Sequence, residues 1–506
     1  MKQLLMKSKE LFESWNNNSI LYIHWKGNDH ILDGLNGDSD LDVLLHKEDR
    51  IKGCQILYDV GFVKFSSQFG SRFPNVEDWL GFDEESGRII HLHLHYALVS
   101  GHAGLKEYDI PWIEDAFESR VQDPDTSLYI MNPNLELVTL YTRLILKSKK
   151  KWIKDAKVGR YVIDKHFQKE IGYIKQRVDW IKVKEISVKY YNSFGDDFCC
   201  IMQEESLSSE HFLQLYHIVS KTMSCCSRYP AGILTVMRAY YDIVIKGRNK
   251  LKAKGNNCII TRKVMNSSNG VSIAFIGQDG CGKSTVTKEI VEWLNWKIEA
   301  SRFYLGSGDH YNGFLKKLIT QFSGKRNSIS VSSKNVEGVV KQHKRKKNVK
   351  SLLSAMLVSM NLLTIAHRAY KQVVKSEKYR RRGGIALFDR FPQTQFYGIY
   401  DGPKIVEYYK RTGLDFWIVR VMANIEKSYL EKIQNYQPKL IFKLILPPEE
   451  SIRRKPFENI DDVTKKHDIT KKLMFPNSQV FEIDATQDYC KEIIFIKNRI
   501  WESIIN

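Results

Sequence analysis

The stretch GQDGCGKST, residues 277–285, constrains the fold of this 506-residue chain more than any other feature. It follows VSIAF, an apolar and β-branched run typical of a buried parallel strand. It precedes STVTKEIVEWL, whose apolar residues recur at helical spacing. A glycine loop between a strand and a helix presents backbone N–H groups to a phosphate. This order predicts a doubly wound parallel sheet in the C-terminal half of the chain.

The loop has the Walker A spacing, in which Gly277 is followed by four residues and then by Gly282-Lys283-Ser284. Lys283 is expected to neutralise the β and γ oxygens of ATP, and Ser284 to offer its hydroxyl to Mg²⁺. The residues expected to bind the nucleotide are Gly277, Asp279, Gly280, Gly282, Lys283, Ser284 and Thr285.

Two further strands bring charged residues to the same edge of the predicted sheet. IALF, 385–388, precedes Asp389, which can orient Mg²⁺ or the attacking oxygen, and Arg390, which suits a phosphate. The strand 440–446 precedes a helix carrying Arg453 and Arg454, which can stabilise charge on a transferred phosphoryl group. Surface ion pairs and a solvated helix end are the alternatives for these residues.

These motifs resemble the thymidylate kinase group of P-loop nucleoside monophosphate kinases over about residues 270–505. The resemblance implies ATP and Mg²⁺ as cofactors, a mobile basic lid, and an acceptor phosphate at Asp389 and Arg390. It also matches Asp279 to an acidic residue of the family's loop. Cys281 stands where some members have a basic residue, so Arg453 or Arg454 would have to supply that charge.

The acceptor is less well specified than the donor. The family's Thr-Arg-Glu-Pro-like segment corresponds here to SRFYLGSGDHYNG, where Arg302 can replace the arginine but Glu-Pro is missing. A basic helical insertion at about 313–382 and the tripeptide DGP, 401–403, are similar to those of thymidylate-kinase-like proteins encoded with surface polysaccharide enzymes. The acceptor is therefore a nucleoside monophosphate such as dTMP, or a sugar or lipid-linked phosphate of a glycan pathway.

The N-terminal half contains a second motif, Ser39-Asp40-Leu41-Asp42. Carboxylates two apart on a strand share a face and can hold two magnesium ions and a triphosphate. Together with Lys26 and Gly27 in HWKGN, a candidate phosphate-binding turn, the motif resembles the nucleotidyltransferase superfamily over about residues 15–130. This superfamily includes DNA polymerase β. The alternative is a pair of acidic residues that ends a strand.

The superfamily usually has a third carboxylate on a neighbouring strand, and the candidate strand here, RIIHLHLHYALV, offers His91, His93 and His95 on one face. Three interpretations stay open. A softer metal such as zinc, manganese or iron is held by Asp40, Asp42 and His93. Alternatively, the fold is kept and catalysis is lost, or the histidines are structural and unrelated to the carboxylates.

The sequence divides into four predicted segments: a nucleotidyltransferase-like α+β domain at 1–130, a helical connector at 131–250, a linker at 251–270 and the P-loop domain at 271–506. The chain carries a net charge of +20, and 325–350 holds nine Lys or Arg against one Glu. Such a surface attracts phosphates, anionic membrane or nucleic acid without choosing between them. The apolar run 352–366 is shorter than a bilayer span and is expected to be a buried helix.

The N-terminal 15 residues lack the continuous apolar core of an export signal, and the eight cysteines lack zinc-like spacing. We therefore expect a cytoplasmic protein, with peripheral membrane association as an alternative. Two further function classes stay open: a nucleotide-gated binding module at membrane or glycan machinery, and a nucleic-acid end-processing enzyme. The latter is disfavoured because the chain has no recognisable RNA-binding motif.

Overall fold

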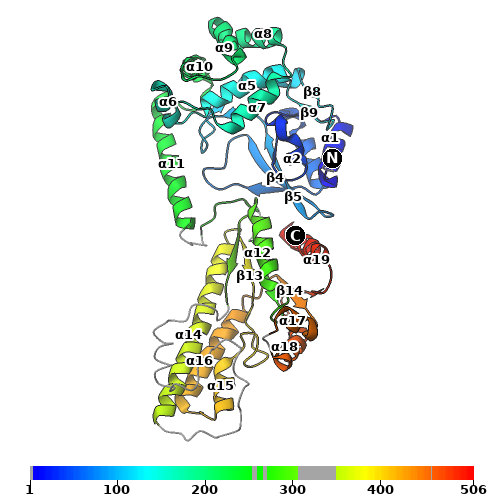
Figure 1. Cartoon of the computed structure of the whole chain (residues 1–506), viewed down its shortest axis with the longest axis vertical. Helices are drawn as coiled ribbons and strands as arrows, with labels where there is room; N and C mark the ends of the chain where they lie inside the picture. The colour runs from blue at the N-terminus through cyan, green and yellow to red at the C-terminus, as the bar shows by residue number, and fades with distance from the viewer. Residues whose placement is uncertain (1–3, 254–258, 266–269, 306–348, 457–458, 506) are drawn as a thin grey trace. The chain divides into compact units, whose positions relative to one another are not determined.

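The computed structural model describes residues 4–253, 259–265, 270–305, 349–456 and 459–505. The chain forms two compact units, Met1–Gly255 (unit 1) and Asn256–Asn506 (unit 2). Their boundary falls within the predicted linker. Both units are mixed α/β, as Figure 1 shows.

Unit 1 is built on a mixed sheet whose central strands pair in the order β3, β4, β5, β2, β1, β9, β8. β2 is parallel to β5 and antiparallel to β1, and β4 is antiparallel to β5. The bounds are β1 (Tyr22–His24), β2 (Asp40–Leu45), β3 (Val63–Ser66), β4 (Val76–Asp83), β5 (Arg88–His95), β8 (Val121–Gln122) and β9 (Tyr129–Ile130). A separate hairpin joins β6 (Val99–Ser100) to β7 (Tyr108–Asp109).

One face of this sheet packs on α1 (Met6–Asn17), α2 (Ile31–Leu35) and α3 (Arg50–Asp59). Val43 and Leu92 of the sheet share a core there with Leu11 of α1. Successive residues of a strand point to opposite faces, so Asp42 and His93 lie on the other face.

The helices between Ile113 and Thr222 share one core with this sheet. α5 is buried along its length, from Asn134 to Leu146, and shares a core with Ile23 and Leu44 of the strands. Its bounds and those of its neighbours are α4 (Ile113–Glu118), α5 (Pro133–Leu146), α6 (Lys150–Lys157), α7 (Lys165–Lys175), α8 (Trp180–Tyr191), α9 (Gly195–Gln203), α10 (Ser209–Thr222) and α11 (Ala231–Ala253). α11 extends three residues beyond the predicted end of the helical segment.

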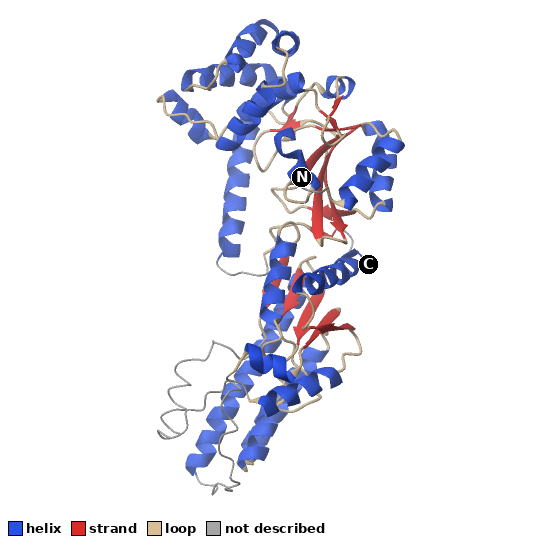
Figure 2. Cartoon of the chain, turned by 45° about the vertical axis from the view of Figure 1, so that its right-hand side comes forward, coloured by secondary structure: helices blue, strands red, loops and turns tan. Residues whose placement is uncertain are grey.

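Unit 2 is built on a parallel sheet of five strands in the order β12, β13, β11, β14, β15 (Figure 2). The strands are β11 (Ser272–Ile276), β12 (Ala300–Phe303), β13 (Ile385–Phe388), β14 (Leu440–Ile445) and β15 (Gln479–Asp484), and β10 (Val264–Met265) precedes them. Ile273, Ala274 and Phe275 of β11 are fully buried, as expected for a central parallel strand. The predicted parallel sheet is therefore confirmed for this unit.

The helices of unit 2 are α12 (Lys283–Asn295), α14 (Val349–Arg380), α15 (Lys404–Thr412), α16 (Trp417–Gln434), α17 (Pro448–Arg454), α18 (Ile460–Lys472) and α19 (Tyr489–Ile505). α14 packs along α16, and Ala355 and Leu362 share a core with Val419 and Ala423. By length and composition α14 could cross a membrane, with 33% of its most apolar window buried. The mostly buried core helix of a soluble protein also meets these criteria, so one such helix is weak evidence for a membrane span.

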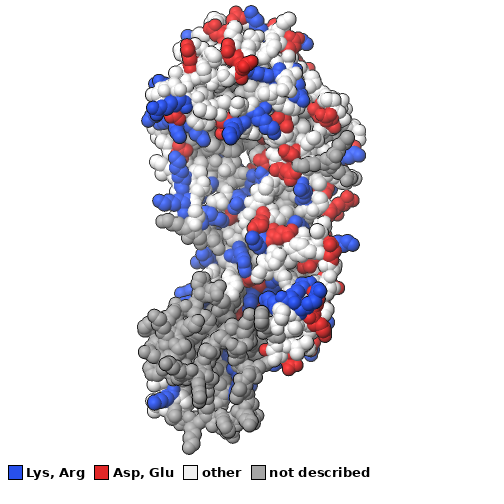
Figure 3. All heavy atoms as spheres, viewed as in Figure 1, with Lys and Arg blue, Asp and Glu red and all other residues white. Residues whose placement is uncertain are grey.

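About half of the predicted basic insertion, including the run from Lys325 to Lys347, lies outside the described residues. On the described surface, basic side chains gather along α11, where Lys246 and Lys250 are exposed (Figure 3). Acidic and basic side chains alternate over the rest of unit 1 in that view.

Candidate functional site

The predicted phosphate loop of unit 2 runs from the end of β11 to the start of α12. Gly277 approaches β14 so closely that a Cβ there would lie 2.4 Å from the carbonyl oxygen of Leu444. Gly282 precedes the first residue of α12 with φ at 92°, in the left-handed region. Both positions therefore require glycine, which explains the spacing read from the sequence.

Lys283 begins α12 and folds back over the loop. Its Nζ donates to the carbonyl oxygens of Gly277 at 2.7 Å and Gln278 at 2.6 Å, and lies 3.6 Å from Cys281 Sγ. Ser284 and Thr285, in the first turn of the same helix, are exposed. The loop thus holds one ammonium group and two hydroxyl side chains at a helix N-terminus, where anions are favoured.

Asp389 directly follows β13, the strand beside β11. Its side chain is buried, and Arg302 of β12 forms an ion pair with Oδ2. The other oxygen, Oδ1, has no hydrogen-bond partner among the described residues. A buried carboxylate oxygen without a partner at the carboxyl edge of the sheet is suited to orienting a cation or a reacting oxygen.

Asp279 lies at the centre of a charged network beside the loop. Lys466 of α18 donates to its Oδ2 at 2.7 Å, and Arg390 Nη2 lies 3.8 Å from its Oδ1. Burial alone would raise the pKa of Asp279, but the charges of Lys466, Lys283 and Arg390 lower it to about 2. Arg390 also lies 4.0 Å from Asp401, so two carboxylates surround its guanidinium.

α17 contacts the loop through Ser451, whose Oγ donates to the carbonyl oxygen of Asp279 at 2.6 Å. The two arginines predicted to serve as a lid make other contacts. Arg453 pairs with Glu450 at 2.7 Å and is mostly exposed, and Arg454 pairs with Glu450 at 3.1 Å and with the carbonyl oxygen of Ala485. The structure brings Lys466, not these arginines, to the loop, and the lid role stays a prediction.

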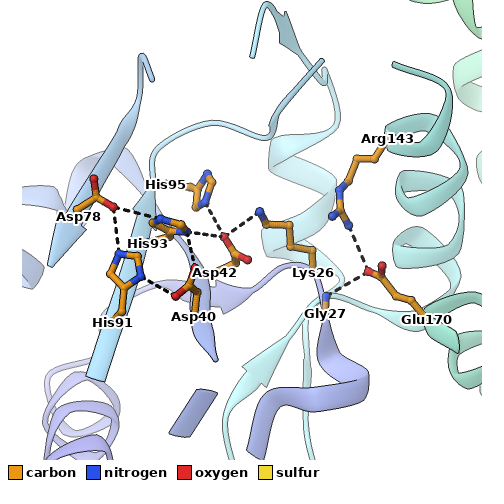
Figure 4. Close-up of polar contacts among 10 residues, drawn as sticks. All are labelled: Lys26, Gly27, Asp40, Asp42, Asp78, His91, His93, His95, Arg143 and Glu170. Carbon is orange, nitrogen blue, oxygen red and sulfur yellow. Dashed lines mark hydrogen bonds and ion pairs between the residues drawn. The ribbon is translucent and has the colours of Figure 1, made fainter. Parts of the chain in front are cut away.

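Unit 1 contains a second cluster, whose polar contacts are drawn in Figure 4. It lies on the sheet face opposite the one that packs on Leu11 of α1. The parallel register of β2 and β5 places Asp40 beside His91 and Asp42 beside His93. The antiparallel register of β4 and β5 places Asp78 on the other side of His93. The predicted shared face of the carboxylates and histidines is therefore present.

The three histidines of this cluster have different environments. His91 is fully buried, with Nδ1 2.7 Å from Asp40 and Nε2 3.0 Å from Asp78, so both of its ring nitrogens are occupied. His93 is partly exposed and lies 3.3 Å from Asp42, 3.9 Å from Asp40 and 3.1 Å from Asp78. His95 Nε2 lies 3.1 Å from Asp42. All three histidines contact at least one of these carboxylates, which counts against the interpretation that they are unrelated to them. His93 is the group in contact with all three carboxylates.

The donor atoms are close enough to share a metal ion. Asp40, His91 and His93 form one group, and Asp42, His93 and His95 another, each with its ligand atoms within 4.8 Å of one another. His93 is common to both groups. Carboxylate and imidazole donors together suit zinc, manganese or iron better than magnesium.

Lys26 connects this cluster to the loop after β1. Its Nζ lies 2.8 Å from Asp42, the same carboxylate that contacts His93 and His95. Burial alone would raise the pKa of Asp42, but the charge of Lys26 and the hydrogen bonds from His93 and His95 hold it well below its usual range.

Sequence reasoning missed Lys466 and Asp78. Lys466 lies on a helix with several other lysines, and nothing in the sequence singles it out. Asp78 supplies a third carboxylate from β4, although the strand expected to supply one was β5, whose position is taken by His93. The only signal for Asp78 was its place in a strand-like run, which does not fix the register.

No family model matches the chain. It is similar to two Escherichia coli K12 proteins. It is 28% identical over 221 residues to "Uncharacterized ATP-binding protein YghR", over 43% of this chain and 81% of the relative. It is 25% identical over 225 residues to "Uncharacterized ATP-binding protein YghS", over 44% of this chain and 89% of the relative.

Among solved structures, deoxyadenosine kinase from M. mycoides with bound dCTP aligns with a TM-score of 0.27 and 14% identity, over 45% of this chain and 98% of that chain. The same enzyme with bound dATP aligns with a TM-score of 0.26 and 14% identity, over 46% of this chain and 98% of that chain. At these values the likeness carries no inference about the activity of this chain.

Proposed function

We propose that unit 2 transfers the γ-phosphoryl group of ATP to a small phosphorylated acceptor. The main supporting observation is that two groups meet at the carboxyl edge of one parallel sheet. Lys283 folds over the glycine loop that follows β11. Asp389 follows the adjacent strand β13, and one of its carboxylate oxygens has no hydrogen-bond partner among the described residues. The similarity to proteins named as ATP-binding supports ATP as the donor.

In this proposal the loop amides and Lys283 bind the phosphates of ATP, and Arg390 binds the acceptor. An acceptor oxygen attacks the γ-phosphorus, the bond to the β,γ-bridging oxygen breaks, and ADP leaves. Ser284 and Asp389 would hold Mg²⁺, which supplies positive charge to the phosphate oxygens. Asp279 fixes the position of Lys466 and Arg390 near the loop through its ion pairs.

The acceptor is a nucleoside monophosphate, with dTMP as first candidate from the thymidylate kinase resemblance. The missing Glu-Pro in the segment after Arg302 favours the second candidate, a sugar or lipid-linked phosphate of a glycan pathway. Both carry a phosphate that Arg390 can bind through two N–H groups.

The test is ATP consumption by the full chain with Mg²⁺, against a panel of nucleoside monophosphates and sugar phosphates. Lys283→Ala is expected to lower turnover at least 100-fold with the fold intact, because one phosphate-stabilising charge is lost. Lys288→Ala is the matched control, since Lys288 is an exposed lysine of the same helix that pairs with Glu292. Equal turnover by the two variants would show that the loop is not the active centre.

We further propose that unit 1 binds a divalent metal through Asp40, Asp42 and His93. The supporting observation is the contact of His93 with both carboxylates, 3.9 and 3.3 Å away. None of the relatives named above is described as a nucleotidyltransferase, so nucleotidyl transfer by this unit stays a prediction from the Asp40 and Asp42 motif.

Metal binding is tested by titrating the full chain with Mn²⁺, Zn²⁺ and Mg²⁺. Asp42→Asn is expected to weaken Mn²⁺ binding at least tenfold, and His93→Gln to weaken Zn²⁺ and Mn²⁺ binding more than Mg²⁺ binding. Asp38→Asn is the control, because Asp38 precedes the same strand and pairs with Arg88. Unchanged binding in Asp42→Asn and His93→Gln would leave the histidines as structural residues.

A nucleotide-gated binding module without phosphoryl transfer is the alternative of a different class. It gains support if ATP binds and no acceptor stimulates its consumption. Membrane association through the basic insertion is tested with anionic liposomes and neutralised Lys344 to Lys347, and nucleic-acid processing by salt-dependent RNA binding.

A further inference from the structure

Four basic side chains of unit 1 are near enough to repel one another beside the Asp–His cluster: Lys26 and Arg143 lie over the same Trp25 ring, and both act on Lys106 and Lys147. They come from three separate segments: Lys26 from the loop after β1, Lys106 from the turn between β6 and β7, and Arg143 and Lys147 from the end of α5. Arg143 and Lys147 are one helical turn apart and therefore lie on one face of α5. We call these four residues the cationic cluster.

The cationic cluster has fewer negative partners than positive charges. Lys26 pairs with Asp42 at 2.8 Å, and Arg143 with Glu170 at 3.3 Å. Lys106 and Lys147 have no ion-pair partner among residues 4–253. Glu107, next to Lys106 in the chain, is paired with Arg238.

Burial and mutual repulsion both lower the pKa of the two unpaired lysines. Burial, and then the charges of Lys26 and Arg143, lower the pKa of Lys106 to about 8. Burial, and then the charges of Arg143, Lys106 and Lys26, hold the pKa of Lys147 well below its usual range. Arg143 is buried and the three lysines are half-buried. Like charges gathered in such positions raise the free energy of the folded chain unless an anion joins them.

The indole N–H of Trp25 adds a hydrogen-bond donor without an acceptor to the cationic cluster. Trp25 is 1% exposed, and its ring lies 4.9 Å from Lys26 Nζ and 5.2 Å from the Arg143 guanidinium. Its Nε1 has no hydrogen-bond partner among the described residues. A buried indole N–H without an acceptor is unusual in a folded protein, because buried donors are nearly always paired.

We propose that the cationic cluster binds a phosphate-bearing ligand. A phosphate group carries close to two negative charges, which match the two lysines without partners, whereas a carboxylate would leave one of them uncompensated. Its oxygens accept several hydrogen bonds at once, as the ammonium, guanidinium and indole donors of the cluster require. Because Asp42 contacts both Lys26 and His93, the bound phosphate would lie next to the candidate metal ligands.

This site belongs to unit 1 and shares no residue with the loop 277–285. Its test is therefore independent of the phosphoryl transfer proposed for unit 2. A nucleotide and a sugar phosphate would both offer the required group. Inorganic pyrophosphate, which carries only the shared phosphate chemistry, is therefore the first probe. Competition by a nucleotide or a sugar phosphate then shows which of the two the site prefers.

The experiment is calorimetric titration of the full chain with inorganic pyrophosphate, in a Lys283→Ala background that weakens the loop of unit 2. Lys106→Gln/Lys147→Gln is expected to weaken pyrophosphate binding at least tenfold. Lys150→Gln/Lys154→Gln is the matched control, since it removes two exposed lysines from the adjacent helix and should leave Kd unchanged. Equal binding by both double variants, or no binding of pyrophosphate, overturns the proposal.

A second measurement, which needs no substitution, distinguishes loss of the site from misfolding of a variant. In the unsubstituted chain, pyrophosphate should slow hydrogen–deuterium exchange in peptides covering 100–110 and 133–147, and unchanged exchange in both peptides contradicts the site. Competition of pyrophosphate by UTP or by glucose 1-phosphate then shows whether a nucleotide or a sugar phosphate is preferred. Competition by neither contradicts a phosphate-bearing metabolite as the ligand.

Discussion

The two units offer positive charge to phosphates in different ways. In unit 2, one lysine and a glycine loop of nine residues are contiguous in the sequence, and the backbone does much of the binding. In unit 1, four side chains from positions 26 to 147 are brought together by the fold, and the backbone contributes little. A local site tolerates little change in its backbone, whereas an assembled site depends on the packing of every segment that contributes to it.

The largest difference between the units is expected from Asp389→Asn. This substitution keeps the shape of the side chain but removes the negative charge near the loop. We expect phosphoryl transfer to fall at least 100-fold, with ATP affinity changed only a few-fold, because the loop amides and Lys283 hold the bound phosphates while Asp389 orients Mg²⁺ or the attacking oxygen. Steady-state kinetics and equilibrium ATP binding measure the two effects.

Pyrophosphate binding in unit 1 is the internal control for that variant and should not change. If Asp389→Asn lowered ATP affinity as much as turnover, Asp389 would be a nucleotide-binding residue without a separate role in transfer.

The next difference is expected between two glycines with unusual backbone environments. In Gly277→Ala the new Cβ would meet the Leu444 carbonyl of β14, which cannot move without breaking the sheet. ATP affinity should fall more than tenfold. In Gly27→Ala, where φ is 72°, the Cβ would meet the side chain of His30 at 2.8 Å, which can rotate away.

We therefore expect Gly27→Ala to lower the free energy of unfolding by about 1–2 kcal/mol, the cost of a left-handed backbone, with ATP affinity unchanged. Equilibrium ATP binding and thermal unfolding of both variants test this. Similar ATP affinity in the two variants would mean that the loop adjusts to a Cβ at 277.

The pH dependence of stability should have opposite signs in the two units. Burial raises the pKa of Glu136 in α5 to about 8, with Glu170 contributing to the same effect. The folded chain therefore binds this proton more tightly than the unfolded chain, and stability is lost as pH rises from about 4.5 to 8. Asp279 has its pKa lowered to about 2, so its contribution is lost as pH falls from about 4 to 2.

Glu136→Gln should remove this loss of stability in unit 1, worth at most about 5 kcal/mol between the ordinary and the raised pKa. Lys466→Gln should destabilise unit 2 at neutral pH, by about 1–2 kcal/mol, and match the unsubstituted chain near pH 2. Differential scanning calorimetry across pH measures both. An alkaline loss that persists in Glu136→Gln would assign it to another group.

The smallest structural effect is expected from Arg453→Gln. Its ion pair with Glu450 is exposed to solvent, so the melting temperature should not change measurably. A tenfold fall in turnover at unchanged stability is the expected result if this arginine stabilises charge during transfer. Unchanged turnover would rule out the predicted lid role of Arg453. Lys466 would then be the residue that supplies positive charge beside the loop.

Much of unit 2 could be predicted because its signals are local. About ten residues of sequence are enough to predict each of three features: the strand ending at Phe388, the glycine loop and the helix beginning at Lys283. The sequence does not predict the contact of Arg302 with Asp389, although it offers Arg302 as a replacement for the arginine of the family's Thr-Arg-Glu-Pro-like segment. Its geometry depends on β12 lying next to β13, which the linear order does not specify.

The sequence by itself determined the phosphate loop, the parallel strands of unit 2, and the shared face of Asp40, Asp42 and the three histidines. Each follows from a repeat of two residues in strands or from the backbone needs of glycine. Only the tertiary structure decided that Asp78 completes the Asp–His cluster, that Lys466 reaches Asp279, and that Lys106 and Lys147 lie beside Arg143. These contacts join segments far apart in the chain, and their positions depend on strand register and helix packing, which no local pattern encodes.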